Sequence, residues 1–385
     1  MAAQHDPLHA AQTLRPTILA ARKETEEARR LAPSVVAGLI DTGLCRLSVP
    51  ASLGGYEAAP MVGLRVYEEL AAAEASVAWI AWNNALPCLL SHFLADAVRA
   101  ELFSDTRRIF ANSTRPSGKA VATGGGFRVS GRWSLVSGCE LADWLLLMCV
   151  VTEGSEPKVR SSGVPELRMA YVPKGSYNIV DTWHVGGLRG TGSHDIVVTD
   201  VFVPTARTHS FADPSQLDRP LYRMPFAALM SAGCAAMCLG IARTAIDALL
   251  EMGAAKIQVD LGPGLRDRPE VQAKIASAAV AVDAARLFLH HVIGDVWTLC
   301  NQKTPVAEMP RARLWEAAVH AARTAKGAVT SMYEAAGTSA LYVDCPLERA
   351  HRDIHAVTQH VVLLHKWLED SGRVRFGLKP NNPLF

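Results

Sequence analysis

Residues 127–135 read FRVSGRWSL, and in this stretch apolar and polar side chains alternate around a Ser130-Gly131 pair. A period of two is typical of a strand with one buried face, and the Ser-Gly pair predicts a hairpin turn. Strand-like apolar runs follow at 144–151, 167–172 and 195–203. Short strands at nearly regular spacing favour a compact antiparallel barrel or sandwich in the middle of the chain.

Helical periodicity lies on both sides of this β-region. Before it, the pattern predicts helices over residues 17–31, 61–75 and 86–103. After it, four long segments rich in Ala, Leu and Arg predict a four-helix bundle over 222–252, 269–300, 310–336 and 347–368. We therefore expect an α+β chain with an N-terminal helical domain (1–110), a central β-domain (111–215) and a C-terminal helical bundle (216–385). The four helices offer more apolar face than one bundle buries, which predicts contacts between subunits.

Composition excludes several classes of protein. Hydrophobic residues make up 49% and charged residues 20% of the 385 residues, and the net charge is +2. These values favour a large core and argue against a nucleic-acid partner. The eight cysteines form no C-x-x-C pair, so we expect no metal site or disulfide framework and a reducing cytoplasm. Residues 1–16 lack the apolar segment of a signal peptide, and the apolar run 229–242 is too short to span a membrane, so it predicts a buried helix.

Three short sequence motifs, here called words, point to a known superfamily. They are RLSVPASLGG at 46–55, EEL at 68–70 and PLERAHRD at 346–353. Their order and spacing, over roughly residues 20–380, resemble the acyl-CoA dehydrogenase superfamily. The resemblance implies the acyl-CoA dehydrogenase fold, with an N-terminal helical domain, a central antiparallel β-barrel and a C-terminal four-helix bundle. It also implies a homotetramer.

Two further words are similar to group D flavin monooxygenases, which are oxygenase components of two-component systems. They are WSLVSGC at 133–139 and TWHVGGLRGTGS at 182–193. The resemblance implies that a separate flavin reductase supplies reduced flavin, and that O2 then gives a C4a-hydroperoxyflavin that hydroxylates or oxidises a small organic substrate. Members of this group act on 4-hydroxyphenylacetate, steroid-derived phenols or dibenzothiophene. Reduced FMN is the cofactor that the resemblance favours, with FAD as the second choice.

The catalytic base of acyl-CoA dehydrogenases is absent from the place where it commonly stands. Those enzymes often carry it in a Tyr-Glu-Gly-Thr word shortly after the Arg-Asp pair, whereas residues 359–363 here read QHVVL. A valine cannot abstract a proton, so the stretch favours a monooxygenase. The alternative is an FAD-dependent acyl-CoA dehydrogenase-like enzyme with a relocated base. A third possibility is a scaffold that binds no flavin, against which the intact 133–139 word argues.

The 133–139 word supplies candidate flavin contacts. Ser137 is expected to accept a hydrogen bond from flavin N5–H, and Gly138 would let the backbone approach the ring. The purely structural alternative is that Ser137 is a strand-end serine that bonds its own turn. Trp133 offers a flat face to the flavin or is an ordinary core tryptophan. Cys139 either lines the substrate pocket or fills space.

Histidines near the C-terminus are candidates for handling protons. His360 falls where the monooxygenases place an active-site histidine, and its alternative is a ring satisfied by a helix neighbour or a partner subunit. His355 is a weaker candidate for contacting substrate. His351 and His355 are four residues apart, but Arg352 replaces the Glu of a zinc protease motif, so we predict no metal.

The resemblance also assigns roles to residues outside these words. Ser113 resembles a residue near the flavin edge, and Gly337, Thr338 and Ser339 resemble a loop that reaches a neighbouring subunit's flavin. Phenol-hydroxylating relatives carry a substrate-binding histidine at a place where residues 82–88 have none, although His92 lies one turn further on. This departure, together with Glu140-Leu141 after the S-G-C word, argues against phenol deprotonation. The substrate would then be an amine, a sulfur heterocycle or an activated polycyclic ring.

Overall fold

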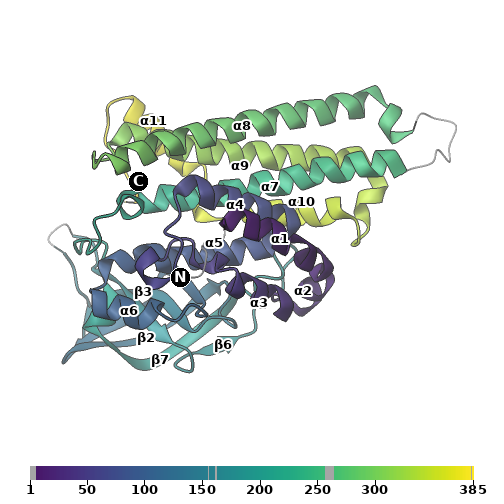
Figure 1. The fold of residues 1–385 in the computed structure, drawn as a ribbon. Coiled ribbons are helices and arrows are strands. Elements are labelled where there is room, and N and C mark those ends of the chain that lie inside the picture. The colour runs from purple at the N-terminus through teal and green to yellow at the C-terminus, as the bar shows by residue number, and fades with distance from the viewer. Residues whose placement is uncertain (1–5, 155, 161–162, 256–263, 383) are drawn as a thin grey trace.

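The computed structural model describes residues 6–154, 156–160, 163–255, 264–382 and 384–385. Figure 1 shows a sheet on one side of the molecule and long helices on the other, with α4 and α5 between them. Residues 1–5 lie outside the described residues. They belong to the segment 1–16, which we expect to hold no signal peptide. The N-terminal helices are α1 (Pro7–Ala20), α2 (Arg22–Ala28), α3 (Pro33–Asp41), α4 (Pro60–Ala73), α5 (Ala75–Leu89) and α6 (Asp96–Phe103).

Helices α4 and α5 form the layer between the sheet and the long C-terminal helices. The predicted helix over 61–75 is confirmed as α4, and the buried Glu74 ends it and caps α5 by accepting from the Ser76 N–H at 3.3 Å. Nearly every side chain of α5 is buried, as expected for a helix with neighbours on all sides. The predicted helix over 86–103 is wrong as one element, because a short 3-10 turn, Leu90–Phe93, separates α5 from α6.

The central sheet is open and mixed, so the prediction of an antiparallel barrel is corrected. Its strands are β1 (Phe110–Thr123), β2 (Gly126–Val136), β3 (Trp144–Glu153), β4 (Glu156–Pro157), β5 (Leu167–Pro173), β6 (Asn178–Val180), β7 (His194–Pro204) and β8 (Thr208–His209). The order is β6-β7-β2-β1-β3-β5-β8, and in the described residues its end strands do not pair. After β2, the chain crosses to the far side of β1, so β3 runs parallel to β1.

The hairpin turn lies at Gly124-Gly125 and not at Ser130-Gly131, which continue β2 as a strand. Gly125 has a φ of +77°, which suits a tight turn. Gly131 pairs with Gly118 across β1 and β2, and a Cβ on Gly118 would overlap the Trp133 ring. Gly131 is therefore needed for packing against Gly118 and the Trp133 ring. A turn prediction from sequence cannot recognise such a role.

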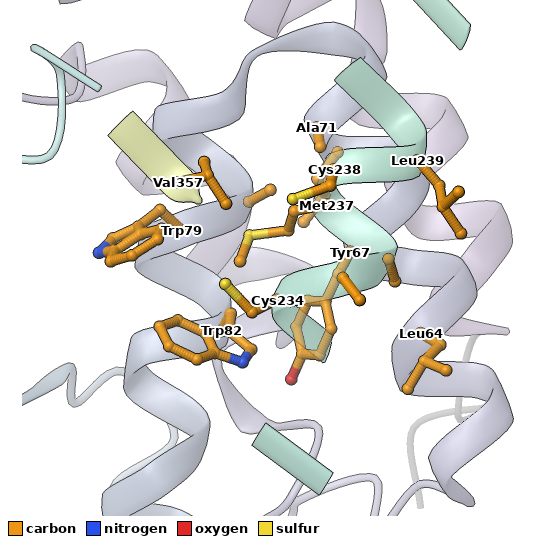
Figure 2. Close-up of a cluster of buried hydrophobic side chains, with 14 of the residues drawn as sticks. Leu64, Tyr67, Ala71, Trp79, Trp82, Cys234, Met237, Cys238, Leu239 and Val357 are labelled. Carbon is orange, nitrogen blue, oxygen red and sulfur yellow. The ribbon is translucent and has the colours of Figure 1, made fainter. Parts of the chain in front are cut away.

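The C-terminal region is built on α7 (Phe226–Ala255), α8 (Pro269–Asn301) and α9 (Glu308–Ala336). The predicted buried helix over 229–242 is confirmed within α7. Figure 2 shows Cys234, Met237 and Cys238 of α7 among side chains of α4 and α5. The eight cysteines are free and buried.

The fourth predicted bundle helix, 347–368, is two helices, α10 (Pro346–Val357) and α11 (Lys366–Arg375). Residues 358–365 between them contain a 3-10 turn, Val361–Leu363. The Thr358 hydroxyl bonds back to the Ile354 carbonyl at 2.8 Å and closes α10, and the Trp367 indole N–H donates to the Val361 carbonyl at 2.7 Å. The prediction of one continuous helix over 347–368 is therefore wrong, and the four-helix bundle as a whole stays a prediction. The expected domain boundaries remain predictions.

Candidate active site

Ser137 and His360, the two predicted catalytic residues, meet at one side chain, Trp79 of α5. The Trp79 indole N–H donates to Ser137 Oγ at 2.9 Å. The His360 ring packs edge-on against Trp79 and Trp82, with ring centroids 5.3 and 5.2 Å away. Residues from α5, the end of β2 and the turn after α10 thus form one group, although Trp79 and Ser137 are 58 positions apart. Apolar rings around two polar groups limit the access of water.

Ser137 also belongs to a chain of hydroxyls. Its Oγ lies 2.7 Å from Ser193 Oγ, which lies 2.6 Å from Thr191 Oγ1. The chain ends at the Leu188 carbonyl, which accepts from the Thr191 hydroxyl at 2.9 Å. The Ser137 carbonyl accepts separately from the Asn83 amide at 3.1 Å. Ser137 is therefore held by side chains from two other segments, α5 and the loop before β7, and the interpretation that it bonds only its own turn does not fit.

His360 is placed by backbone geometry rather than by a side-chain partner. It follows α10, and the backbone N–H of Val362 donates to its Nδ1 at 3.4 Å. Burial, together with the positive charge of Arg115, lowers the His360 pKa to about 4. The ring is then neutral at pH 7, with Nδ1 as an acceptor and the proton on Nε2. Nε2–H is thus a donor that the backbone orients.

Gly138 and Cys139 follow Ser137 in a tight turn. Gly138 has a φ of +75°, and a Cβ there would approach the Ile80 side chain at 3.0 Å. Its N–H donates to the Thr191 carbonyl at 2.9 Å. Cys139 is buried with its thiol 3.6 Å from the Gly192 carbonyl, and burial raises its pKa to about 12. The thiol is therefore uncharged at neutral pH, and its predicted contact with substrate stays a prediction.

Trp133 lies inside the β-domain and apart from the Ser137–His360 group. It is fully buried among core residues of the sheet, and its indole N–H donates to the Met148 carbonyl at 2.8 Å. The ring packs over Gly118 and Gly131. These contacts favour the interpretation as a core tryptophan, and contact with flavin stays a prediction.

Ser113 lies on β1 next to a polar cluster that sequence reasoning missed. The Asn112 amide donates to the Asn83 carbonyl at 2.8 Å, and Ser113 Oγ accepts from the Arg115 backbone N–H at 3.4 Å. The β1–β3 register shifts between Ser113 and Gly118, which lifts residues 114–117 out of the sheet as an exposed bulge. Asn83 thus ties β1 to the carbonyl of Ser137.

His92 lies in a separate aromatic cluster. Its Nδ1 is 2.8 Å from Ser215 Oγ, and its ring packs tilted against Phe93 and stacks on Tyr222. The fully buried His209 stacks on Phe93 at a centroid distance of 5.0 Å, and neither of its ring nitrogens has a hydrogen-bond partner in the described structure. Burial lowers the pKa of His92 to about 4 and that of His209 to about 3. Both rings are neutral at pH 7.

The remaining candidates lie on other faces. His355 packs against His351, with ring centroids 4.5 Å apart, and burial lowers its pKa. In the described residues, no group of three or more His, Cys, Asp or Glu side chains could hold a metal ion. Gly337 and Thr338 are exposed and Ser339 is half-buried in the turn that ends α9. Their predicted contact with a neighbouring subunit's flavin therefore remains a prediction.

A charged cavity of about 810 Å³ lies between the N-terminal helices and α10. Its lining includes Arg349 and the buried Glu74, whose charged atoms are 3.5 Å apart. Burial raises the pKa of Glu74 against the opposing effect of Arg349. Burial and the Glu74 charge also raise the pKa of Asp353, which accepts from the Leu188 N–H at 2.7 Å. This cavity does not include Ser137 or His360 among its lining residues.

Glu26 of α2 joins three segments at the edge of the charged cavity. Its carboxylate lies 2.8 Å from Arg352 and 3.8 Å from Arg349, both of α10. It also lies 3.4 Å from Arg189, in the loop that carries Thr191. The N-terminal region thereby contacts the supports of both Ser137 and His360.

Known proteins resemble this chain over nearly its whole length. Residues 9–106 match the family model "Acyl-CoA dehydrogenase, N-terminal domain", and residues 232–364 match "Acyl-CoA dehydrogenase, C-terminal domain". Indole-3-acetate monooxygenase from Pseudomonas putida is 31% identical over 93% of this chain and 90% of its own. This chain belongs to the flavin-dependent monooxygenase family that has the acyl-CoA dehydrogenase fold. The sequence-based recognition is confirmed, and the protein is an oxidoreductase.

Two further relatives support the flavin-dependent monooxygenase family. The oxygenase subunit HsaA of a flavin-dependent monooxygenase from Rhodococcus jostii (strain RHA1) is 31% identical over 90% of this chain and 92% of its own. The structure of XiaF from a Streptomyces species, in complex with FADH2 and glycerol, is 25% identical and covers 99% of this chain and 97% of its own, with a TM-score of 0.90. Flavin dependence, expected from the 133–139 word, is thus confirmed for the family.

The residues of this monooxygenase fit a flavin beside Ser137. The serine oxygen accepts one hydrogen bond from Trp79, and a hydroxyl oxygen has two acceptor positions. Gly138, at a φ of +75°, gives the turn after Ser137 a backbone conformation that side chains rarely adopt. His360 supplies a neutral donor next to the same indole. This combination of an acceptor and a donor suits a heteroaromatic ring that has both N–H and acceptor atoms.

The most important residues that sequence reasoning missed in the monooxygenase are Trp79 and the pair Thr191 and Ser193. Trp79 lies between the predicted helices 61–75 and 86–103, and nothing local shows that its indole reaches Ser137. The residues 191–193 were recognised as part of a family word, but their hydroxyls could be linked to Ser137 only through the β2–β7 pairing.

Acidification should destabilise the monooxygenase through its buried neutral histidines. The His209 pKa is about 3, against about 6.5 in an unfolded chain. The unfolded chain therefore binds the proton first as pH falls, and stability present above pH 6.5 is lost toward pH 3. Thermal unfolding should show a lower Tm at pH 4.5 than at pH 7. The variant His209→Phe should lose less Tm over this range, and an unchanged slope would contradict this assignment.

Proposed function

We propose that this chain acts on a small aromatic, polycyclic or amine substrate as the oxygenase component of a two-component system. The observation that carries the proposal is the convergence of Ser137 and His360 on Trp79, in a family of flavin-dependent monooxygenases. The dehydrogenase alternative requires a carboxylate base, and the turn beside His360 offers Val361 and Val362 instead.

We assign a separate role to each side chain of the candidate site. Reduced flavin, when bound, supplies the electrons that activate O2. Ser137 would accept a hydrogen bond from N5–H of a bound reduced flavin and would keep that proton in place. His360, through Nε2–H, would orient the oxygen atom to be transferred or handle its proton. Trp79 and Trp82 keep water from the reacting atoms.

The substrate class follows from the walls of the site and from the relatives. Trp82 faces His360 and also lines a small apolar cavity of about 30 Å³ with Tyr67, Leu89 and Leu229. A planar apolar substrate would enlarge this cavity by displacing side chains. Indole-3-acetate, which the Pseudomonas relative is named for, carries a planar indole ring and is the first compound to test. His92 and Cys139 stay candidates for lining the substrate channel, and His355 is less favoured by its contact with His351.

Cofactor, assembly and location complete the proposal. Reduced FMN remains the preferred flavin, and the FADH2 complex of XiaF supports FAD as the second choice. A separate reductase delivers the flavin by diffusion. Helix α8 exposes Val280 and Leu287, at 70% and 69% of their surface, and an exposed apolar face supports contacts between the subunits of a homotetramer. Sedimentation as a monomer would contradict the homotetramer. We place the oxygenase in the cytoplasm.

The test is an anaerobic titration with reduced FMN and reduced FAD, followed by addition of ¹⁸O2 and indole-3-acetate or related aromatic compounds. We expect flavin binding and one labelled oxygen atom in the product. Tightly bound FAD that is bleached by an acyl-CoA would favour the dehydrogenase alternative. Failure to bind either flavin would support the scaffold alternative.

A further inference from the structure

We propose that Ser193 and Thr191 are positioning residues that make the Ser137 hydroxyl an obligate hydrogen-bond acceptor toward flavin. The consequence is that the site selects reduced over oxidised flavin. The inference rests on the proposed function, because it assumes that Ser137 meets the flavin N5 atom.

The order of protons in the hydroxyl chain follows from counting. Three oxygen–oxygen contacts connect Ser137 to the Leu188 carbonyl, at 2.7, 2.6 and 2.9 Å. Two oxygens this close need a proton between them, since lone pairs would otherwise repel. The three hydroxyls carry three protons, and the carbonyl carries none. Thr191 therefore donates to Leu188, Ser193 donates to Thr191, and Ser137 donates to Ser193.

The Leu188 end of the hydroxyl chain is fixed in place. The Leu188 carbonyl also accepts from the Trp183 indole N–H at 3.1 Å, and the Leu188 N–H donates to Asp353. Thr191 and Ser193 are buried, at 1% and 3% exposure, so water cannot readily replace a missing hydroxyl. A fixed acceptor at one end thus sets the direction of every bond up to Ser137.

Ser137 is left with one acceptor position for a ligand. Its proton points to Ser193, and one of its two lone pairs receives the Trp79 indole N–H. Reduced flavin carries a proton at N5 and can donate to the remaining lone pair. Oxidised flavin has a lone pair at N5, which would face the lone pair of Ser137. The proton order therefore favours the reduced form before any oxygen chemistry begins.

The experiment measures the Kd of FMN in both redox states under anaerobic conditions, with dithionite for the reduced form. Wild type should bind reduced FMN more tightly. In Ser193→Ala, the Ser137 proton is free to rotate toward N5, so the ratio of oxidised to reduced Kd should fall about tenfold, as for one hydrogen bond. Thr191→Val should act in the same direction, and Thr191→Ser should keep the wild-type ratio.

A double variant separates positioning from simple structural damage. In a Ser137→Ala background, Ser193→Ala should change the ratio no further, because its effect acts through Ser137. Melting temperatures identify a variant that fails to fold, in which case Thr191→Val carries the test. An unchanged ratio in a folded Ser193→Ala protein, or equal affinity of wild type for both forms, would overturn the inference and leave the proposed function intact. Wild type that binds neither form would overturn the proposed function itself.

Discussion

Ser137→Ala is expected to bind reduced flavin and to waste it as hydrogen peroxide. The variant lacks the acceptor that the proposal assigns to N5–H, and one net hydrogen bond corresponds to about a tenfold change in rate or equilibrium. Peroxide released per reduced flavin should therefore rise by about this factor, while substrate oxidised per flavin falls. Peroxide and product are measured together in single-turnover mixing with O2.

The control for this variant is Ser134→Ala, which removes a half-buried hydroxyl three positions earlier on β2. Ser137→Ala also leaves the Trp79 indole N–H without its acceptor, so we expect a stability loss of about 1–3 kcal/mol. Unchanged coupling between flavin consumption and substrate oxidation in Ser137→Ala would refute the assigned role.

His360→Ala is expected to lower product formation by about 100-fold, the lower range for loss of a positioned proton-handling group. The effect on Tm should be small, because the ring lies at the edge of Trp79 and Trp82 and accepts a long hydrogen bond, 3.4 Å, from the Val362 backbone N–H. Product yield and thermal unfolding are measured on the same preparation. A large fall in Tm with little loss of yield per folded enzyme would show a structural histidine instead.

His355→Ala is the matched control, since it removes another half-buried imidazole five positions earlier on α10. It should leave product yield near the wild-type value. The pKa of about 4 adds a second check. His360 is neutral from about two pH units above that value, so its contribution to product yield should be constant between pH 6 and 8.

The alternating and helical patterns predicted most elements, because local periodicity reflects the face that each element buries. The turn at Ser130-Gly131 was predicted wrongly because a glycine needed for ring packing looks like a turn glycine. The break between α10 and α11 was missed because residues 347–368 contain neither Gly nor Pro. It depends on local bonds of Thr358, His360 and Trp367 to backbone groups two to six residues away, which the spacing of apolar residues does not reveal.

The sequence proposed candidate site residues where the family's sequence words are contiguous, as for Ser137 and Gly138. His360 was proposed through its position after Arg352-Asp353, and the structure brings it and Ser137 to the same Trp79 ring, even though the helix around it was predicted wrongly. Trp79 and Ser193 were missed because their importance lies in contacts across 58 and 56 positions. No local pattern encodes such contacts, which arise when α5, β2 and β7 pack together.

The ion pairs of Glu26 have a practical consequence for shortening or fusing this enzyme. A chain that began at Pro33 would retain Ser137, His360 and Trp79, yet it would leave Arg352 and Arg349 without one of their acidic partners. It would also release Arg189, next to the hydroxyls that orient Ser137. A minimal oxygenase therefore has to include α2, and affinity tags or fusion partners belong where they leave this helix docked.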